Sequence, residues 1–218
     1  MRMLICRHGH TPRNIDSNGN ELVRGWDEVS LSYQGRMEAL ELAKQIERRY
    51  NVSMVYTSDL ARAMETAEFI ADHTKGQVVP SIGLRTWHLG ELEGKPVKEV
   101  LRELQHFDTH PDECPRGGET KNFFLARLSS NLDEIMSDSR KRKSDTIMVT
   151  HGRCFAAIPG ILSGSGRTVP YTGVPKTGAL ALLKPDGKQW KMTVFSRELR
   201  TLAMREGFPG SHILCCEF

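Results

Sequence analysis

The stretch Met3-Leu4-Ile5-Cys6-Arg7-His8-Gly9-His10-Thr11 joins a short apolar run to a group of polar residues. The apolar run predicts a buried strand, and its end at Arg7 predicts that the strand stops at a binding site. The guanidinium of Arg7 offers a planar set of donors that suits phosphate. The imidazole of His8 can act as a base, a metal ligand or a nucleophile, and Gly9 lets the backbone approach a bound group closely. Arg-His-Gly also arises by chance, so its meaning depends on the rest of the chain.

A second apolar run, residues 146–150, is followed by His151-Gly152, and Arg62 lies near the start of an amphipathic segment. In sheets with parallel strands, ligands bind beyond the carboxyl ends of the strands. Because His8 and His151 both follow predicted strands, we expect them to share one site. Together with Arg7 and Arg62 they could surround a single phosphoryl group.

Short apolar runs alternate with longer amphipathic runs along the chain. The pattern predicts strands at 2–6, 52–57, 77–80, 146–150, 178–183 and 190–195, and helices at 33–49, 59–74, 96–107, 119–138 and 152–162. This alternation favours an α/β fold with a mostly parallel central sheet flanked by helices on both faces. Because no Pro/Gly/Ser-rich linker divides the chain, we expect one domain spanning residues 1–218.

The composition excludes several function classes. The 218 residues carry 30 basic and 27 acidic side chains, a net charge of +3 that gives no case for nucleic-acid binding. Five cysteines without metal-site spacing indicate reduced thiols and a cytoplasmic protein. The amino terminus does not resemble a signal peptide. No apolar stretch approaches the roughly 18 residues that a membrane span needs, so we expect no membrane partner.

Several stretches recur in the order that is typical of one family: RHGHTPRN from Arg7, RGWDEVSLSYQG from Arg24, SDLARAMETA from Ser58, LGELEG from Leu89, PRGGET from Pro115 and VTHG from Val149. Because it carries these stretches in this order, the chain resembles the histidine phosphatase superfamily, also called the phosphoglycerate mutase-like family. The resemblance spans most of residues 3–152. It implies a phosphoglycerate mutase-like fold and an enzyme that acts on a small phosphorylated molecule without a cofactor.

The resemblance also implies roles for individual residues. His8 would attack phosphorus and form a phosphohistidine, while Arg7, Arg62 and His151 would complete the phosphate pocket. Two cations nearby would lower the pKa of His8 and keep it neutral. By the same resemblance Asn14, Gly25 and Gly152 would lie against the phosphate. A metal bound by His8 and His10 is disfavoured, because two arginines would repel a cation and no acidic cluster offsets them.

One position departs from the family pattern. The family usually carries a glutamate four residues before the glycine of its GxxEG stretch, and that glutamate acts as general acid. Here the glycine is Gly90 and the position holds Thr86. Loss of a general acid typically costs about 10²- to 10⁴-fold in rate. The acid could come from elsewhere, with His88, Glu91, Glu93 and Glu119 as candidates. Alternatively, the substrate could have a good leaving group, the enzyme could be weak or inactive, or the threonine could be a deliberate replacement.

Three activities therefore stay open: a phosphatase, a phosphoglycerate mutase-type isomerase, and a phosphate-ligand binder without catalysis. The resemblance favours the phosphatase, because mutases of the superfamily typically carry a longer insertion between the positions of Gly94 and Pro115. Four arginines could line the mouth of the site and favour a second anionic group on the substrate, or could be ordinary surface residues: Arg24, Arg85, Arg116 and Arg153. Trp26 has a better claim than Trp87 to flank the pocket. Residues 197–218 could pack on the domain or form a homodimer.

Overall fold

The structure is a computed structural model, and it describes residues 2–15, 18–164, 176–186 and 189–194. It is built on a six-stranded sheet with the order β3-β2-β4-β1-β5-β6. The strands are β1 (Met3–Arg7), β2 (Val52–Ser58), β3 (Gln77–Ser81), β4 (Asp145–Thr150), β5 (Leu180–Asp186) and β6 (Gln189–Val194). The α-helices are α1 (Tyr33–Glu47), α2 (Ala61–Thr74), α3 (Leu101–Thr109), α4 (Lys121–Lys141) and α5 (Gly152–Leu162).

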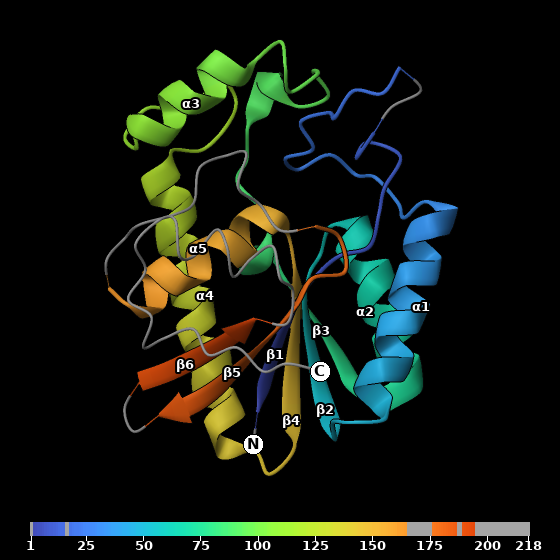
Figure 1. Cartoon of the computed structure of the whole chain (residues 1–218). Coiled ribbons are helices and arrows are strands. Elements are labelled where there is room, and N and C mark those ends of the chain that lie inside the picture. The colour runs from blue at the N-terminus through green and yellow to red at the C-terminus, as the bar shows by residue number, and fades with distance from the viewer. Residues whose placement is uncertain (1, 16–17, 165–175, 187–188, 195–218) are drawn as a thin grey trace.

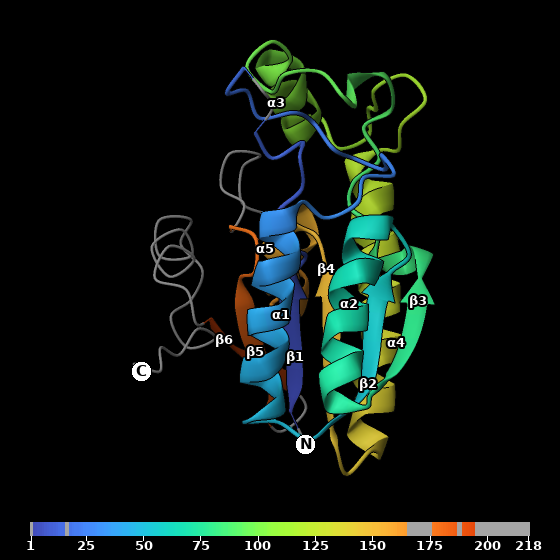
Figure 2. The same ribbon diagram turned by 90° about the vertical axis from the view of Figure 1, so that its right-hand side faces the viewer.

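The sheet is mostly parallel, as the sequence predicts. Strands β1 to β4 pair in parallel, whereas β5 and β6 form an antiparallel edge beside β1. Helices α1 and α2 cover one face, and α4 and α5 cover the other (Figures 1 and 2). The α/β prediction with helices on both faces is therefore confirmed.

Alternation along β1 explains the two layers. Successive side chains of a strand point to opposite faces. Met3 and Ile5 accordingly pack in the cluster that contains α4 and α5, and Leu4 and Cys6 in the cluster with α1 and α2. All five residues of β1 are buried. Central parallel strands that are covered on both faces therefore read as continuous apolar runs.

Most predicted elements lie within three residues of their observed bounds, but α3 differs. The sequence predicts a helix from residue 96, whereas α3 begins at Leu101. The preceding residues are held by tertiary contacts: Leu22 and Pro96 form an isolated β-bridge, and Val97 N donates to Glu21 O at 2.8 Å. These contacts keep the segment out of the helix. They also place α3 beyond the carboxyl ends of the parallel strands (Figure 1).

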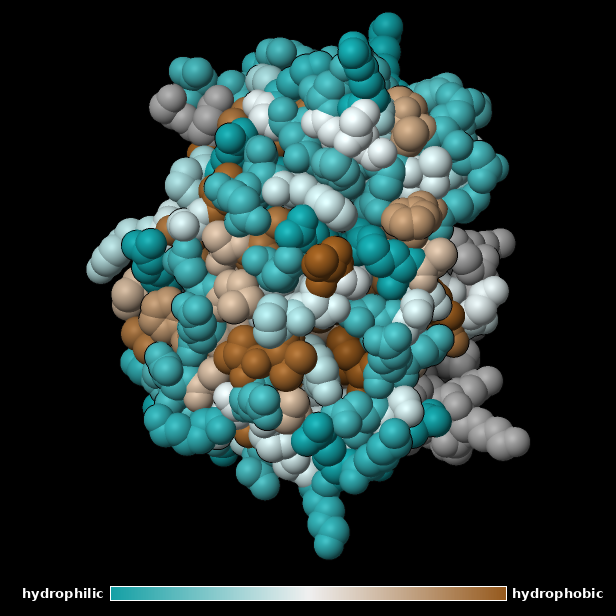
Figure 3. Space-filling model, turned by 180° about the vertical axis from the view of Figure 1, so that it is seen from behind, coloured by the Kyte–Doolittle hydropathy of each residue, from teal (hydrophilic) through white to brown (hydrophobic). Residues whose placement is uncertain are grey.

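The surface seen from behind the view of Figure 1 is mainly hydrophilic, with hydrophobic side chains scattered among polar ones (Figure 3). In the described part of the chain, no helix is long and apolar enough to cross a membrane. Residues 197–218, to which the sequence gives a packing or dimer role, lie outside the described residues. The homodimer and the single domain stay predictions.

The loop after β1 packs tightly on the first turn of α1. Ser32 caps this helix by accepting a hydrogen bond from Gly35 N. A Cβ on Gly9 would meet the carbonyl oxygen of Gly35, and a Cβ on Gly35 would overlap the backbone of His10. Only glycine at both positions allows this approach.

We therefore expect Gly35→Ala to destabilise the protein by about 1–3 kcal/mol, because backbone atoms must move to admit a methyl group. Urea denaturation measures the effect. Gln34→Ala, at the exposed neighbouring position, is the matched control and should stay within about 0.5 kcal/mol. Equal stability of the Gly35→Ala variant and the control would contradict the tight contact.

Candidate active site

Strand register brings the two predicted histidines together. In the parallel pair of β1 and β4, Arg7 is opposite Thr150, so His8 and His151 follow equivalent positions. His8 N donates to Thr150 O at 3.0 Å, which extends the pairing by one residue. The ring centroids of His8 and His151 lie 5.1 Å apart. The prediction that both histidines share one site agrees with this geometry.

A small cavity, about 40 Å³ in volume, lies at this edge of the sheet. This volume exceeds the roughly 10–15 Å³ that one water needs. The lining residues include seven that the sequence analysis names for catalysis or phosphate binding: Arg7, His8, Gly25, Arg62, Thr86, His151 and Gly152. The remaining lining residues are Glu21, Arg24, Trp87, Leu89 and Arg153.

The two histidines are almost completely buried beside cations. Burial, followed by the charges of Arg62 and Arg7, holds the pKa of His8 well below its usual range. The pKa of His151 is lowered by burial, Arg62, His8 and Arg7. The sequence predicts the influence of the arginines, but burial is the larger cause. Both imidazoles are therefore neutral near pH 7.

The neutral form of His8 has a defined tautomer. Its Nδ1 lies 2.7 Å from the carbonyl oxygen of Gly9. A carbonyl only accepts hydrogen bonds, so Nδ1 carries the proton and Nε2 carries the lone pair. In contrast, neither ring nitrogen of His151 has a hydrogen-bond partner among the described residues. Buried polar atoms of this kind require a partner, and a bound anionic oxygen could supply one.

Arg62 lies in the first turn of α2 and is fully buried. Its Nη1 donates to Asp27 O and its Nη2 to Gly25 O, each at 2.7 Å. Gly25 has a positive φ of 45°, and a Cβ there would collide with the carboxylate of Glu93. Burial lowers the pKa of Arg62 to about 10, so the guanidinium stays charged near pH 7.

Thr66 links Arg62 to the loop that carries His8. Its hydroxyl donates to Arg62 O at 2.8 Å, one helical turn back, and accepts from Gly9 N at 3.2 Å. This buried bridge ties the first turn of α2 to the end of β1. The nucleophile candidate and the cation candidate are therefore held by one short chain of hydrogen bonds.

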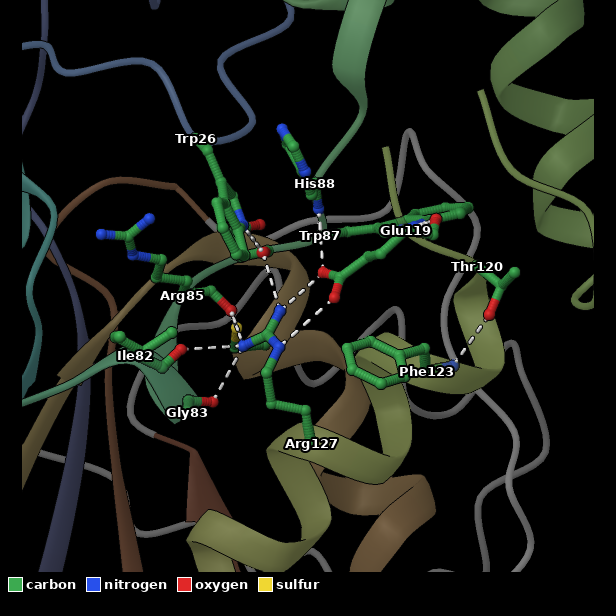
Figure 4. Close-up of polar contacts among 12 residues, drawn as sticks. Trp26, Ile82, Gly83, Arg85, Trp87, His88, Glu119, Thr120, Phe123 and Arg127 are labelled. Carbon is green, nitrogen blue, oxygen red and sulfur yellow. Dashed lines mark hydrogen bonds and ion pairs between the residues drawn. The ribbon is translucent and has the colours of Figure 1, made fainter. Parts of the chain in front are cut away.

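Thr86 lines the cavity at the position that the resemblance predicts. Its segment follows the 3-10 turn η1 (Ile82–Leu84) and is fixed by Arg127 of α4 (Figure 4). Arg127 donates to the carbonyl oxygens of Ile82, Gly83, Arg85 and Thr86, and to both carboxylate oxygens of Glu119.

Trp26 holds the same segment from the other side. Its Nε1 donates to Thr86 O at 2.7 Å, and its ring stacks on His88 at 4.4 Å between centroids (Figure 4). The Arg85 guanidinium lies 4.5 Å from the centre of the Trp26 ring. The backbone of Thr86 is thus fixed from two sides.

The structure places some predicted residues elsewhere. Asn14 is not among the residues that line the cavity. Instead its Oδ1 accepts from the backbone N and the hydroxyl of Thr11, at 2.8 and 2.9 Å. A contact with phosphate stays a prediction for Asn14. Trp87 lines the cavity and Trp26 does not, so the preference for Trp26 was wrong.

The four arginines that could line the mouth or lie on the surface divide into two pairs. Arg24 and Arg153 line the cavity. Arg85 forms a bidentate ion pair with Asp59, and Arg116 is exposed. Sequence periodicity cannot separate these pairs, because tertiary contacts decide which guanidinium reaches the site.

None of the four proposed acid donors lines the cavity. Glu119 pairs with Arg127 at 2.6 Å, and Glu93 accepts from Leu89 N at 2.9 Å. His88 is stacked on Trp26, and Glu91 is exposed. Within the described residues, Glu21 is the carboxylate that does line the cavity. It belongs to no motif, so the sequence gives no signal for it.

Two further observations bear on the alternatives. A larger concavity of about 690 Å³ lies between α1 and the start of β5, but no predicted site residue lines it. Across the ranges that the structure describes, no group of three or more His, Cys, Asp or Glu side chains could hold a metal ion.

A cavity at the carboxyl edge of a parallel sheet, with buried arginines and neutral histidines, is the kind of site that binds and transfers a phosphoryl group. A sequence profile of the histidine phosphatase superfamily (branch 1) matches residues 3–197. The chain belongs to this superfamily, and the resemblance drawn from its motifs is confirmed. Membership supports a phosphatase or a mutase activity.

Individual relatives are of both kinds. The chain is 28% identical to phosphoglycerate mutase-like protein 4 of Arabidopsis thaliana, over 95% of this chain and 91% of that protein. It is 28% identical to a broad-specificity phosphatase of Saccharomyces cerevisiae, over 72% and 68% of the two chains. A mycobacterial glucosyl-3-phosphoglycerate phosphatase has a similar fold, with a TM-score of 0.73 and 22% identity, covering 88% of this chain and 97% of the other.

The lowered pKa values of His8 and His151 predict how stability depends on pH. The unfolded chain binds protons at these side chains near pH 6.5, whereas the folded protein does not. Lowering the pH below 6.5 therefore favours unfolding, by up to about 1.4 kcal/mol per pH unit for each histidine. Stability is fully present above pH 6.5 and is lost as the pH falls toward the folded-state values.

Urea denaturation between pH 7.5 and 5 measures this slope. His151→Gln should make it shallower, because one source of protonation on unfolding is gone. His110→Gln, at an exposed position at the end of α3, is the control and should keep the wild-type slope. Identical slopes in all three proteins would contradict a buried neutral His151.

Proposed function

We propose that this protein is a phosphatase that hydrolyses a small phosphorylated metabolite through a phosphohistidine on His8. The observation that carries the proposal is the state of His8: a buried neutral imidazole whose Nδ1 proton is bound by Gly9 O, beside two arginines. Its Nε2 lone pair is available for attack on phosphorus. The protein's remaining task is to stabilise the charge of the phosphoryl group in transfer.

The other residues have matching roles in this proposal. Arg7 and Arg62 bind the equatorial oxygens, and His151 donates a hydrogen bond to one of them. Gly25 and Gly152 bring backbone close to the phosphate. Attack by His8 Nε2 breaks the bond between phosphorus and the leaving oxygen, and water then cleaves the P–N bond to release phosphate. Neither step requires a cofactor or a metal ion.

The leaving oxygen takes up a proton in the first step. Thr86 cannot supply it as an acid near neutral pH. A substrate with a good leaving group, such as an acyl phosphate or a phosphohistidine, needs little protonation. For an alkyl phosphate, Glu21 is the described lining residue with a carboxyl group, and it is paired with Arg24 at 3.0 Å. We therefore expect the enzyme to prefer substrates with good leaving groups.

A mutase is the second candidate. It is supported by a likeness to a phosphoglycerate mutase of Staphylococcus haemolyticus, which is 31% identical over 69% of this chain and 64% of that protein. A mutase must keep water from its phosphoenzyme, whereas a phosphatase must admit it. Interconversion of 2- and 3-phosphoglycerate without phosphate release would favour the mutase.

Location in the cytoplasm stays part of the proposal.

We expect His8→Ala to lower phosphate release by at least about 1,000-fold, because the nucleophile is removed. Release is measured with aryl, acyl and alkyl phosphates. Brief incubation with radiolabelled substrate should trap an acid-labile phosphoenzyme in the wild type only. His10→Ala is the matched control, since His10 pairs with Ser32 Oγ at 2.9 Å and does not line the cavity. Retained turnover in a folded His8→Ala protein would refute the mechanism.

Thr86→Glu should raise turnover of alkyl phosphates by at least about 10-fold and change aryl phosphates less, because it restores a general acid at a lining position. The comparison variant is Glu21→Gln. If Thr86→Glu has no effect while Glu21→Gln abolishes alkyl phosphate turnover, the proton comes from Glu21. The favoured restriction to good leaving groups would then be wrong.

A further inference from the structure

The charges that line the cavity are unbalanced. In the described part of the chain, the lining residues carry four guanidinium groups, those of Arg7, Arg24, Arg62 and Arg153, and one carboxylate, that of Glu21. A bound phosphate dianion brings two negative charges. With the dianion bound, the formal charges of these lining side chains and the phosphate still sum to about +1, which favours a ligand with another anionic group.

Contacts distinguish the roles of the four arginines. Arg7 and Arg62 line the cavity together with the two histidines, and in the proposed function they bind the phosphoryl group. Arg24 pairs with Glu21 at 3.0 Å. Arg153 is the fourth arginine, and it lies two residues after His151 in the first turn of α5.

Arg153 is built into the wall of the cavity. Its side chain is only 9% exposed, and its guanidinium lies 5.4 Å from the centre of the Trp87 ring, itself a lining residue. Its Nη2 contacts Asp108 Oδ1 at 2.5 Å. A long side chain held between an aromatic ring and a carboxylate loses little further freedom when it binds a ligand.

The carboxylate of Asp108 is shared between two cations. Lys121 Nζ lies 3.2 Å from Asp108 Oδ1 and donates to Asp108 O at 2.7 Å. The trio of Arg153, Asp108 and Lys121 therefore has a net charge of +1. Of these three residues, Arg153 is the one that lines the cavity.

We propose that Arg153 binds a second anionic group, a carboxylate or a second phosphate, on the substrate. This inference rests on the proposed function, in which the first phosphoryl group occupies the pocket of Arg7, Arg62 and the histidines. A guanidinium suits both anions, because its parallel N–H groups match two oxygens of either. Arg153 is then a residue that determines specificity rather than one that takes part in phosphoryl transfer.

Matched ligand pairs test the proposal. 3-Phosphoglycerate and glycerol 3-phosphate differ only by a carboxylate in place of a hydroxymethyl group. Fructose 1,6-bisphosphate and fructose 6-phosphate test a second phosphate. The readout is the ratio of dissociation constants within each pair, measured by calorimetry, and the ratio of kcat/KM where turnover occurs. His8→Ala supplies the binding ratio if the wild type hydrolyses the ligands.

The wild type should prefer the more anionic member of at least one pair by roughly 10- to 100-fold, the typical contribution of a charged hydrogen bond. Arg153→Gln should bring that ratio close to 1, and Arg153→Lys should restore part of it. Arg116→Gln is the matched control: it removes an exposed arginine that does not line the cavity, and it should keep most of the preference.

Equal or undetectable binding of both members of both pairs to the wild type would overturn the proposal. An unchanged ratio in Arg153→Gln would also overturn it, since a merely structural arginine would weaken both ligands alike. These outcomes are independent of catalysis. If no ligand is turned over but the binding preference is present and depends on Arg153, the phosphatase proposal would be refuted. The proposed anion site would still be supported.

Discussion

The parallel pairing of β1 with β4 is the constraint on which the site depends. Because Arg7 lies opposite Thr150, His8 and His151 leave the sheet side by side. A shift of one residue would exchange the faces of all β1 side chains and move Met3 and Ile5 out of their cluster. The same apolar packing that stabilises the fold therefore fixes the spacing of the two histidines. Thr150 adds a further link, since its hydroxyl donates to Leu84 O at 2.9 Å near the segment of Thr86.

The partners of Arg62 show how a fold can bury a cation and still leave its charge for a ligand. Its guanidinium donates to the carbonyl oxygens of Gly25 and Asp27. Carbonyl groups satisfy hydrogen bonds but neutralise no charge, whereas a carboxylate partner would cancel most of the field at the cavity. Burial is the larger cause of the lowered pKa values of His8 and His151; the remaining positive field lowers them further and suits a phosphate dianion. One arrangement thus keeps the nucleophile candidate neutral and attracts the anion.

Local sequence patterns predicted the features that depend on residues close together in the chain. Apolar periodicity located the strands and most helices, and motif spacing placed His8, His151, Arg62 and Thr86 at one cavity. Contacts between distant segments were beyond this reasoning. The start of α3 depends on a bridge from Leu22 to Pro96. Asn14 accepts a hydrogen bond from Thr11, three residues before it. Glu21 lines the cavity although it belongs to no motif. Whether an arginine lines the site or pairs on the surface likewise depends on partners such as Asp59 and Asp108, which spacing along the chain does not reveal.

The site is supported by two separate parts of the fold. The residues proposed to bind phosphate lie on or directly after β1 and β4, and on α2. Thr86 is instead held through its backbone carbonyl, by Arg127 of α4 and by Trp26. Because these contacts involve only the backbone, they fix position 86 whatever side chain it carries. In the proposed mechanism, a threonine in place of an acid would alter proton supply to the leaving group without moving Arg62 or the histidines. We therefore expect phosphate binding and leaving-group choice to be separable in this fold, because the side chain at position 86 can change while the residues around the cavity stay in place.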